Sequence, residues 1–433
     1  MEFRNLTPLH AMTFDAVDVQ QHEFHVAVMR VGYRLVRRPG ATRDEPTHTC
    51  ELLEGDDALS LVMADEYDGE VNRSSVKFES DLAPFKPRCD VLVRATGYAP
   101  KSVPATTWGA RFRAFDGPAK VIDKGLRLMG ARSFRRGLLG WRAGQPAPCV
   151  EVPIRWEYAF GGASHVIQAA SGKAEGEPPM ETVLNEVCFT NPLGSGWIEK
   201  RYLSLAGKKD VRRTSCVLET ATPGDRINEV RACQIEAWDH PIGGVVVGEH
   251  PSGELDARRM AEVSSNYAAT PVGLGPVGRA WTPRLQRAGT YDEAWQRDTW
   301  PYLPQDFDFR YWNGAPDDQQ IAWPTQDFAF ELVNLAAPEH TANGHLRARL
   351  PGHRAVTVLR FEHGAVAPIA TRLDTILIDT EAMQVALTWR AVFPVNPPVR
   401  VCEMRFETDP HAPLLRLDHA VMQGDQEEEA LNG

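Results

Sequence analysis

The sequence predicts a mainly β protein with β-sandwich-like sheets, few short helices and long loops. Apolar and polar residues alternate with a period of two along several segments, which gives an extended strand one apolar face. Only short stretches keep the 3.6-residue spacing of a helix. Small polar residues with proline and glycine fill residues 164–182, as is typical of a long exposed loop.

The first expected strand covers residues 24–35. Its apolar positions are even-numbered up to Val28 and odd-numbered from Val31 onward. Because one extra residue exchanges the two faces of a strand, we expect a β-bulge near Met29 and Arg30.

Two segments follow in the first half of the chain. Residues 120–139 are a candidate for partial helix, although three glycines weaken that assignment. The next segment is expected to be a strand, because its apolar residues alternate with polar ones and share one face: Val152, Ile154, Trp156, Tyr158 and Phe160.

Two short helices are expected in the second half. Residues 255–267 have helical spacing through Met260 and Val263. A second helix is expected to begin at Thr290, because Thr290 and Glu293 have the spacing of a capping box, and Pro301 would stop it.

Alternation returns near the C-terminus. Residues 346–350 and 356–358 are expected to form a pair of strands joined by a turn at Pro351 and Gly352. A last strand has an apolar face formed by Val385, Leu387, Trp389, Ala391 and Phe393.

A chain of 433 residues is too long for one ordinary core and is expected to form two or three domains. A β-rich region is expected over residues 1–336, with a candidate sub-domain boundary at 164–182. Residues 337–408 are expected to form a C-terminal β unit that begins with a linker. After residue 408 the sequence loses its periodicity, so 409–433 is expected to be a disordered tail.

Composition limits the classes of partner and compartment. The net charge is −11, from 47 basic and 58 acidic residues, which argues against nonspecific binding of nucleic acid. We expect neither a signal peptide nor a membrane span, since no basic segment precedes an apolar run and no run approaches 18 apolar residues. A cytoplasmic location follows.

The seven cysteines are widely spaced without a C-x-x-C pair, which favours buried thiols over zinc ligands.

Charge is unevenly distributed along the chain. Residues 44–70 contain ten acidic residues and no lysine or arginine, whereas residues 111–142 contain nine basic residues against Asp116 and Asp123. Solvated faces are the expected explanation, and a docking surface or mutual contact is the alternative. The basic stretch lacks the aromatic platform on which single-stranded nucleic acid stacks.

Motifs for catalysis are weak. Residues 273–278 match G-x-G-x-x-G, but Pro276 removes a backbone donor and no helix can follow, so we expect a structural loop. Ser195 lacks the glycine two residues earlier that a nucleophile elbow needs. His22 and His25 point to opposite faces of a predicted strand and cannot share a metal. We therefore predict no catalytic residue, no cofactor and no metal.

The best candidates for acid–base or metal chemistry are Asp306, Asp308, Asp317 and Asp318. Asp306 and Asp308 are two residues apart, hence on one face of an expected strand, where paired carboxylates can bind a cation. Alternatively, these carboxylates accept backbone N–H groups or pair with nearby arginines, which are Arg284, Arg297 and Arg310. A metal-dependent hydrolase is therefore one alternative function.

Residues 271–323 form a block rich in aromatic residues, which contains five of the eleven tryptophans: Trp281, Trp295, Trp300, Trp312 and Trp323. Glycines, prolines, aspartates and arginines lie among them, a mixture that suits one specific, loop-rich surface. Core packing is the expected role of most of these tryptophans. A protein-binding surface is the next interpretation, since tryptophan and arginine are favoured binding residues. A stacking platform for sugars is the third.

Four segments, in order, resemble a known family. They are KPRCDVLVRATGYAP (86–100), VPIRWEYAFGG (152–162), NPLGSGW (191–197) and the block at 273–320. That family, once catalogued only as a domain of unknown function, is associated with type VI secretion. Its members act as cytoplasmic adaptors that load toxic effectors onto the secretion spike. This chain departs from the family at LMGARSFRR (128–136), where members carry a Gly-Asp-Arg-x-Trp-like turn, which implies a different partner if that turn makes contact.

The resemblance implies a non-catalytic adaptor or chaperone. Its partners are expected to be the N-terminal or PAAR-like region of a type VI effector and the trimeric spike protein of the valine–glycine-repeat type. Binding by apolar surfaces and edge strands needs no ATP. The candidate partner-binding residues are Trp281, Arg284, Trp312 and Asp317. Charge reversal at Arg284 or Asp317 is expected to abolish effector capture while leaving thermal stability nearly unchanged, and an equal loss of stability would make these residues scaffold. A carbohydrate-binding module is the other alternative.

Overall fold

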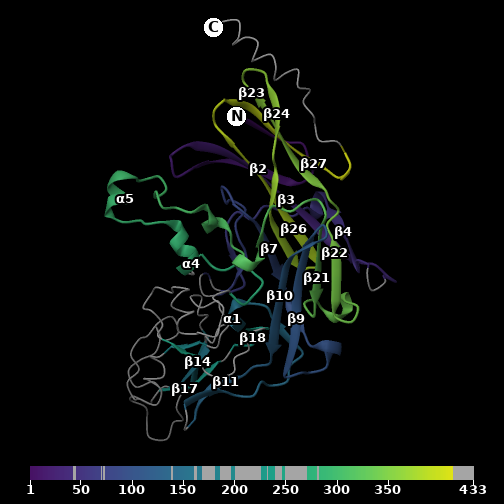
Figure 1. Ribbon diagram of the computed structural model, residues 1–433, viewed down its shortest axis with the longest axis vertical. Helices are drawn as coiled ribbons and strands as arrows, with labels where there is room; N and C mark the ends of the chain where they lie inside the picture. Colours follow the sequence, from purple (N-terminus) through teal and green to yellow (C-terminus); the bar gives the residue numbers. More distant parts are fainter. Residues whose placement is uncertain are drawn as a thin grey trace.

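The computed structural model describes residues 1–41, 45–69, 71, 74–137, 140–159, 163–167, 181–185, 197–199, 226–231, 233–238, 246–248, 271–279 and 282–412. Strands dominate these residues and the helices are short, so the prediction of a mainly β fold is confirmed. Figure 1 shows the larger sheets stacked along the long axis of the molecule, with α5 projecting to one side.

The largest sheet lies at the centre of the molecule (Figure 1) and has the order β2-β3-β26-β25-β7-β20, with β4 paired to β3. Its strands are β2 (His10–Val17), β3 (Glu23–Arg37), β4 (His48–Leu53), β7 (Cys89–Arg94), β20 (Gln320–Ile321), β25 (Arg372–Asp379) and β26 (Gln384–Pro394). The β25–β7 pair is parallel, and the other pairs are antiparallel. The predicted strand 385–393 is confirmed as β26.

The predicted bulge in the first strand is wrong. Strand β3 pairs with β26 from Phe24 opposite Pro394 to Arg34 opposite Gln384, without a register shift. Every residue from 26 to 33 is buried, because both faces of β3 are covered. A strand buried on both faces does not need a strict alternation, so the change in apolar pattern required no extra residue.

The two faces of the central sheet differ in chemistry. One face is apolar and belongs to the main core, with Val31, Leu387, Ile376 and Val91 in neighbouring strands. The opposite face has a row of polar residues in direct register, which are Arg30, Thr388, Thr375 and Asp90. Residues that follow β6 cover this polar face and supply its ionic partners, since buried charges require them.

Asp81 and Lys86 are those partners. Asp81 accepts hydrogen bonds from Arg30 at 3.0 Å and from Thr388 Oγ1 at 2.8 Å. Lys86 Nζ donates to Asp90 at 2.8 Å and to Thr375 at 2.9 Å. The buried charges of this face are therefore paired.

The second large sheet has the order β18-β10-β9-β21-β22. Its strands are β9 (Thr107–Asp116), β10 (Ala119–Met129), β18 (Ile235–Ala237), β21 (Phe328–Val333) and β22 (His345–Arg349). The predicted partial helix at 120–139 is wrong, because Ile122, Lys124, Leu126 and Leu128 are buried at alternate positions of β10. This period of two is that of a strand. Apolar residues of this sheet and of the central sheet belong to one core.

The third sheet has the order β1-β27-β23-β24 and consists of β1 (Glu2–Asn5), β23 (Arg354–Phe361), β24 (Val366–Ile369) and β27 (Val399–Glu407). The strands predicted on either side of Pro351 and Gly352 exist as β22 and β23, but they do not pair with each other. The turn, with Gly352 at φ +76°, instead leads the chain from one sheet into another. The expected C-terminal unit therefore contributes strands to all three large sheets.

Shorter strand pairs complete the described β-structure: β5 (Glu66–Tyr67) with β6 (Val76–Phe78), β8 (Thr96–Tyr98) with β13 (Glu151–Pro153), and β16 (Trp197–Glu199) with β19 (Val246–Gly248). A further sheet contains β11 (Ser133–Gly137), β12 (Gly140–Ala143), β14 (Ala163–Ile167), β15 (Glu181–Asn185) and β17 (Arg226–Arg231). The loop predicted at 164–182 is wrong at both ends, since 164–167 belong to β14 and 181–182 to β15, and the rest of this candidate boundary lies outside the described residues.

The described helices are short. They are α1 (Trp156–Ala159), α4 (Thr282–Leu285), α5 (Glu293–Asp298) and the 3₁₀ turns η1 (Gly55–Asp57), η2 (Pro100–Ser102), η3 (Gln286–Ala288), η4 (Phe309–Trp312), η5 (Asp317–Gln319) and η6 (Pro338–His340). Across the described ranges, none has the length and apolar character that crossing a membrane would require. The predicted helix at 255–267 lies outside the described residues.

Two sequence predictions need correction at α1 and α5. The strand predicted from Val152 ends at Pro153, and Trp156 begins α1, where its N–H donates to Ser75 Oγ at 2.8 Å. The helix predicted at Thr290 begins at Glu293, because Asp292 is the N-cap and accepts from Trp295 N.

The five described cysteines are free thiols. Cys89, Cys233 and Cys402 are buried, whereas Cys50 and Cys149 are half-buried. The prediction of buried thiols is thus confirmed for three of them. Cys188 and Cys216 lie outside the described residues.

The two charged stretches find ionic partners elsewhere. The acidic stretch 44–70 pairs with arginines outside 111–142, through Asp57–Arg34, Asp65–Arg279 and Asp68–Arg94. The basic stretch pairs with carboxylates outside 44–70, through Arg113–Glu331, Lys124–Asp318 and Arg132–Glu236. Both stretches therefore contribute ion pairs that connect distant parts of the chain.

Stability is expected to fall as the pH drops from 6.5 to about 4, partly because of His48. This side chain on β4 is 1% exposed, its Nε2 has no hydrogen-bond partner among the described residues, and burial lowers its pKa from 6.5 to about 4. The unfolded chain therefore binds more protons than the folded chain in this window, so folding is favoured above it and progressively weakened within it. The contribution is about 2–3 kcal/mol.

Urea unfolding of the wild-type and His48→Gln proteins at a series of pH values would test this expectation. The variant should lose less stability between pH 6.5 and 4 than the wild type. His22→Gln, at an exposed histidine, is the matched control and should follow the wild-type curve. Parallel curves for His48→Gln and wild type would contradict the assignment.

Candidate protein-binding surface

The aromatic block is hydrogen-bonded to β7, the strand next to the edge of the central sheet. Val93 N donates to Leu274 O at 2.9 Å, and the Gln319 amide donates to the carbonyls of both Val91 and Leu274 at 2.9 Å. Two segments of the block, one near residue 274 and one near 319, therefore pack against the same strand. Residues 86–100 and 273–320, which carried much of the resemblance, meet here.

Asp90 is the central acceptor of this junction. Its carboxylate is fully buried and accepts from Asn313 Nδ2 and Gly314 N at 3.0 Å and from Ala315 N at 3.3 Å. It also pairs with Lys86, as described above. One carboxylate thus fixes both the start of β7 and the chain around residue 314.

Residues 273–278, which match G-x-G-x-x-G, form a packing loop against α1. A Cβ atom at Gly273 would lie 2.5 Å from the Trp156 ring, a distance that side-chain atoms do not tolerate. Trp156 Nε1 donates to Pro276 O at 2.7 Å. Glycine is required at position 273 because the Trp156 indole approaches so closely. The loop therefore has a packing role.

Arg284 lies in the interior of the block. It is 2% exposed, and it donates to Glu79 at 2.5 Å, to Val277 O at 2.6 Å and to Tyr311 O at 2.9 Å. These contacts join α4 to three other segments, near residues 79, 277 and 311. Charge reversal at Arg284 would therefore place a carboxylate beside Glu79 and disrupt the scaffold, contrary to the expectation of unchanged stability.

The other candidate residues differ in exposure. Trp312 is half-buried, with the Arg279 guanidinium 5.0 Å from its ring centre. Asp317 is exposed and makes one ion pair, at 3.3 Å, with Arg287. Trp281 lies outside the described residues. A partner-binding role for these residues stays a prediction, and Asp317 is the one that faces solvent among the three described candidates.

Asp306 and Asp308 do not lie on a strand, so their predicted shared strand face is wrong. Asp306 accepts from Thr290 N at 2.9 Å and Thr290 Oγ1 at 2.7 Å, and these bonds hold its pKa below the usual value. Asp308 is the N-cap of η4 and accepts from Arg310 N at 2.9 Å and Arg310 Nε at 2.6 Å. Both carboxylates serve local structure, as the alternative interpretation predicted.

The Asp306–Thr290 contact closes the base of a projecting loop, residues 289–306, which we call the α5 arm. Gly289 at its base has φ +83°, and a Cβ there would lie 2.8 Å from Asp306 Oδ1. Gln305 Nε2 donates to Val19 O at 2.9 Å and ties the arm to the loop before β3. Figure 1 shows α5 at the far left, away from the sheets.

The α5 arm presents aromatic rings to solvent. Trp300 is 67% exposed, Tyr291 52% and Tyr302 40%. The Trp295 ring lies between two of them, with ring centres 4.7 Å from Tyr291 and 5.6 Å from Trp300, and its Nε1 donates to Tyr302 O at 2.9 Å. We call these four residues the arm surface. Rings this exposed and this well supported are typical of protein-binding sites.

A model of the bacterial protein family described as "Uncharacterized protein conserved in bacteria (DUF2169)" matches residues 21–390, most of the chain. The chain belongs to this family. No curated protein and no solved structure matches it. The family description gives no activity or partner, so the association with type VI secretion is taken up below as a proposal.

For this DUF2169 protein, the described residues contain no group of three or more histidine, cysteine, aspartate or glutamate side chains arranged to hold a metal ion. Asp306, Asp308 and Asp317 are thus not gathered into such a group. The structure instead brings together the donors around Asp90 and the four aromatic residues of the arm surface.

The four candidate partner-binding residues predicted from the sequence do not include the arm surface, although Trp295 and Trp300 were among the five tryptophans of the block. Trp300 and Tyr302 flank Pro301 just after the end of α5, and this Trp-Pro-Tyr sequence was the available signal. Because proline cannot continue a helix, the two rings on either side of Pro301 fall outside α5. The exposed rings lie at that point.

Proposed function

We propose that this DUF2169 protein is a non-catalytic cytoplasmic adaptor that binds a type VI secretion effector and loads it onto the secretion spike. The observation that supports binding is the arm surface, a cluster of solvent-exposed aromatic rings on a supported loop. The resemblance of residues 86–320 to effector adaptors supports the choice of partner.

The arm is suited to binding because it is held in place before a partner arrives. Asp306 and Thr290 fix its base, and Trp295 supports Tyr291 and Trp300 from within. A surface ordered in advance loses less conformational entropy on binding, so more of the contact energy appears as affinity. Tryptophan and tyrosine are the residues most often found at the energetic centres of interfaces.

The geometry of the rings favours a protein partner over a sugar. The planes of Trp295 and Trp300 make an angle of 90°, and those of Tyr291 and Trp295 an angle of 72°. Edge-to-face rings form an uneven apolar surface that suits interdigitating side chains, whereas a carbohydrate would need a flat ring face of its own. The carbohydrate-binding module therefore becomes the second candidate.

Binding is also favoured over hydrolysis. Asp306 and Asp308 already accept hydrogen bonds from Thr290 and Arg310. Recruiting them as a metal site would break the contacts that hold the arm and η4. Asp317 lies in η5, a separate turn.

An adaptor of this kind works through differential affinity. It covers an apolar region of the effector before secretion and releases it when the spike offers a tighter complex. No nucleotide is required. Unpaired edges of the described sheets, such as β24, could add a strand from the partner.

Co-expression with an effector that has a PAAR-like N-terminal region would test the proposal. We expect a stoichiometric complex by affinity capture and by size-exclusion chromatography with light scattering, and an effector that is insoluble or degraded when expressed alone. The matched control is the same effector without its N-terminal region, which should not be captured. Separate elution of two soluble proteins would contradict the adaptor function.

A further inference from the structure

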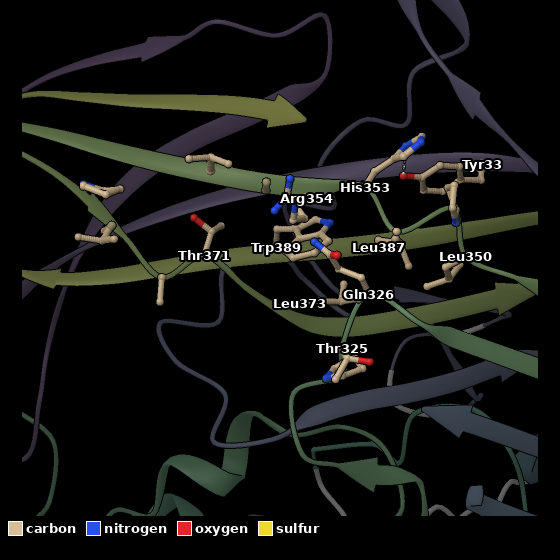
Figure 2. A pocket seen from close by; sticks show the side chains of 18 residues that line it. Tyr33, Thr325, Gln326, Leu350, His353, Arg354, Thr371, Leu373, Leu387 and Trp389 are labelled. Carbon is tan, nitrogen blue, oxygen red and sulfur yellow. Dashed lines mark hydrogen bonds between the residues drawn. The ribbon is translucent and has the colours of Figure 1, made fainter. Parts of the chain in front are cut away.

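A pocket of about 450 Å³ lies between the turn that joins β22 to β23 and the connection from β24 to β25, over the middle of β26. Figure 2 shows Arg354, Trp389 and Gln326 near its centre, with Thr371 on the left and His353 and Tyr33 on the right. Pockets of this volume are large enough for a small molecule or a short peptide segment. None of the residues discussed for the arm surface lines it.

The walls of the pocket are mainly apolar. Leu350, Leu373, Leu387 and Ile369 contribute aliphatic side chains, and Trp389 contributes an aromatic ring. These residues come from three of the large sheets, since they lie on or next to β22, β24, β25 and β26. An aliphatic ligand would be removed from water here.

Arg354 introduces a positive charge into these apolar walls. Its Nη2 donates to the backbone carbonyls of Ala412 at 2.6 Å and Asp409 at 3.3 Å, which neutralise no charge. No carboxylate oxygen of the described residues lies within 4.0 Å of its guanidinium. Glu407, opposite Arg354 in β27, accepts instead from Asp409 N at 2.8 Å.

Two donors at this site have no acceptor. Arg354 Nε and Trp389 Nε1 are both buried without a hydrogen-bond partner among the described residues. Trp389 as a whole is 9% exposed. Buried N–H groups are normally satisfied, so an acceptor from outside that enters this pocket would complete both donors. A carboxylate would supply both the acceptor atoms and the negative charge that Arg354 lacks.

We infer that this pocket binds an apolar carboxylate, that is, an aliphatic body with a terminal carboxylate directed to Arg354 and Trp389. This chemistry could come from a medium-chain fatty acid or from the C-terminal end of a polypeptide with apolar last residues. The inference does not depend on the adaptor proposal, because the pocket and the arm surface are separate sites with separate tests.

Isothermal titration calorimetry with the full chain would test this inference with four probes. Octanoate is expected to bind at least 10-fold more tightly than octanol, because the alcohol lacks the charge. N-acetyl-Leu-Leu carboxylate is expected to bind at least 10-fold more tightly than its C-terminal amide. Whichever of octanoate and the dipeptide binds more tightly identifies the source of the carboxylate.

Three variants make the test specific to the pocket. Arg354→Gln should weaken octanoate binding at least 10-fold, as expected for the loss of a charge-assisted hydrogen bond. Ala370→Trp places a large ring on an exposed position of the pocket lining and should abolish binding without loss of stability, which covers the case in which Arg354→Gln folds poorly. Arg34→Gln, at an exposed arginine on β3, is the matched control and should leave binding unchanged.

Equal affinity for octanoate and octanol, or unchanged octanoate binding by both Arg354→Gln and Ala370→Trp, would overturn the inference. Failure of the effector capture described above would leave it intact. Loss of octanoate binding in Arg34→Gln as well would show a nonspecific charge effect and would also overturn it.

Discussion

Replacing Asp90 with alanine is expected to lower the free energy of unfolding by about 3–5 kcal/mol, because it leaves a buried ammonium group without its partner. Lys86 Nζ lies 2.8 Å from the Asp90 carboxylate, and both side chains are buried. The substitution also removes the acceptor for the N–H groups of Gly314 and Ala315. Unsatisfied buried donors add to the loss. Urea unfolding followed by tryptophan fluorescence would measure it.

Two further variants give the Asp90 experiment its controls. Asp317→Ala removes an exposed carboxylate from the same block and should change the unfolding free energy by less than about 0.5 kcal/mol. Adding Lys86→Met to Asp90→Ala should recover part of the loss, because the unpaired ammonium disappears while the donors at 313–315 stay unsatisfied. A loss below about 1 kcal/mol for Asp90→Ala would contradict a junction that depends on this carboxylate.

The sequence predicted strands well where apolar residues recur at every second position. The alternation at 385–393 corresponds to β26, and the segments on either side of Pro351 and Gly352 correspond to β22 and β23. The pairing of those two strands could not be predicted. A proline–glycine turn reverses or redirects the chain equally well, and the choice here depends on distant strands, since β22 pairs with β21 and β23 with β27.

Local patterns failed where distant contacts decide the backbone. The alternation through Trp156 predicted a strand, but the residue begins α1 with its indole bonded to Pro276, 120 residues further along the chain. At 120–139 the sequence predicted a partial helix, and its three glycines already weakened that assignment. Gly109 of β9 and Gly125 of β10 instead lie against Trp238, where an added Cβ atom would be 2.6 Å and 3.0 Å from atoms of its side chain, so these two glycines make room for it.

In the candidate site as well, composition predicted the kind of structure but not which side chains are buried and which are exposed. The density of aromatic and charged residues at 271–323 correctly predicted loop-rich structure with many specific contacts. Composition could not show that Arg284 is enclosed by Glu79, Val277 and Tyr311 while Trp300 faces solvent. That difference depends on residues near position 79, which reach the block only because the chain after β6 covers the polar face of the central sheet.

Replacing Trp300 with alanine is expected to weaken effector capture by about 30-fold or more, because truncating a central aromatic residue of an interface removes about 2 kcal/mol or more of binding free energy. Trp300 is 67% exposed, so its loss should change the melting temperature little. Capture of the PAAR-like effector by surface-immobilised protein, together with thermal unfolding, would separate the two effects. Arg284→Glu should show the opposite pattern, with stability lost first.

Trp238→Ala is the matched control for Trp300→Ala. Trp238 is also an exposed tryptophan, at 57%, but it lies next to β18, at the edge of a sheet that does not include the arm. A protein partner that uses the arm surface requires capture to fall for Trp300→Ala and to stay unchanged for Trp238→Ala. Equal losses would indicate nonspecific apolar adhesion. Unchanged capture by both variants would move the interface away from the α5 arm, with the exposed Asp317 as the next position to change.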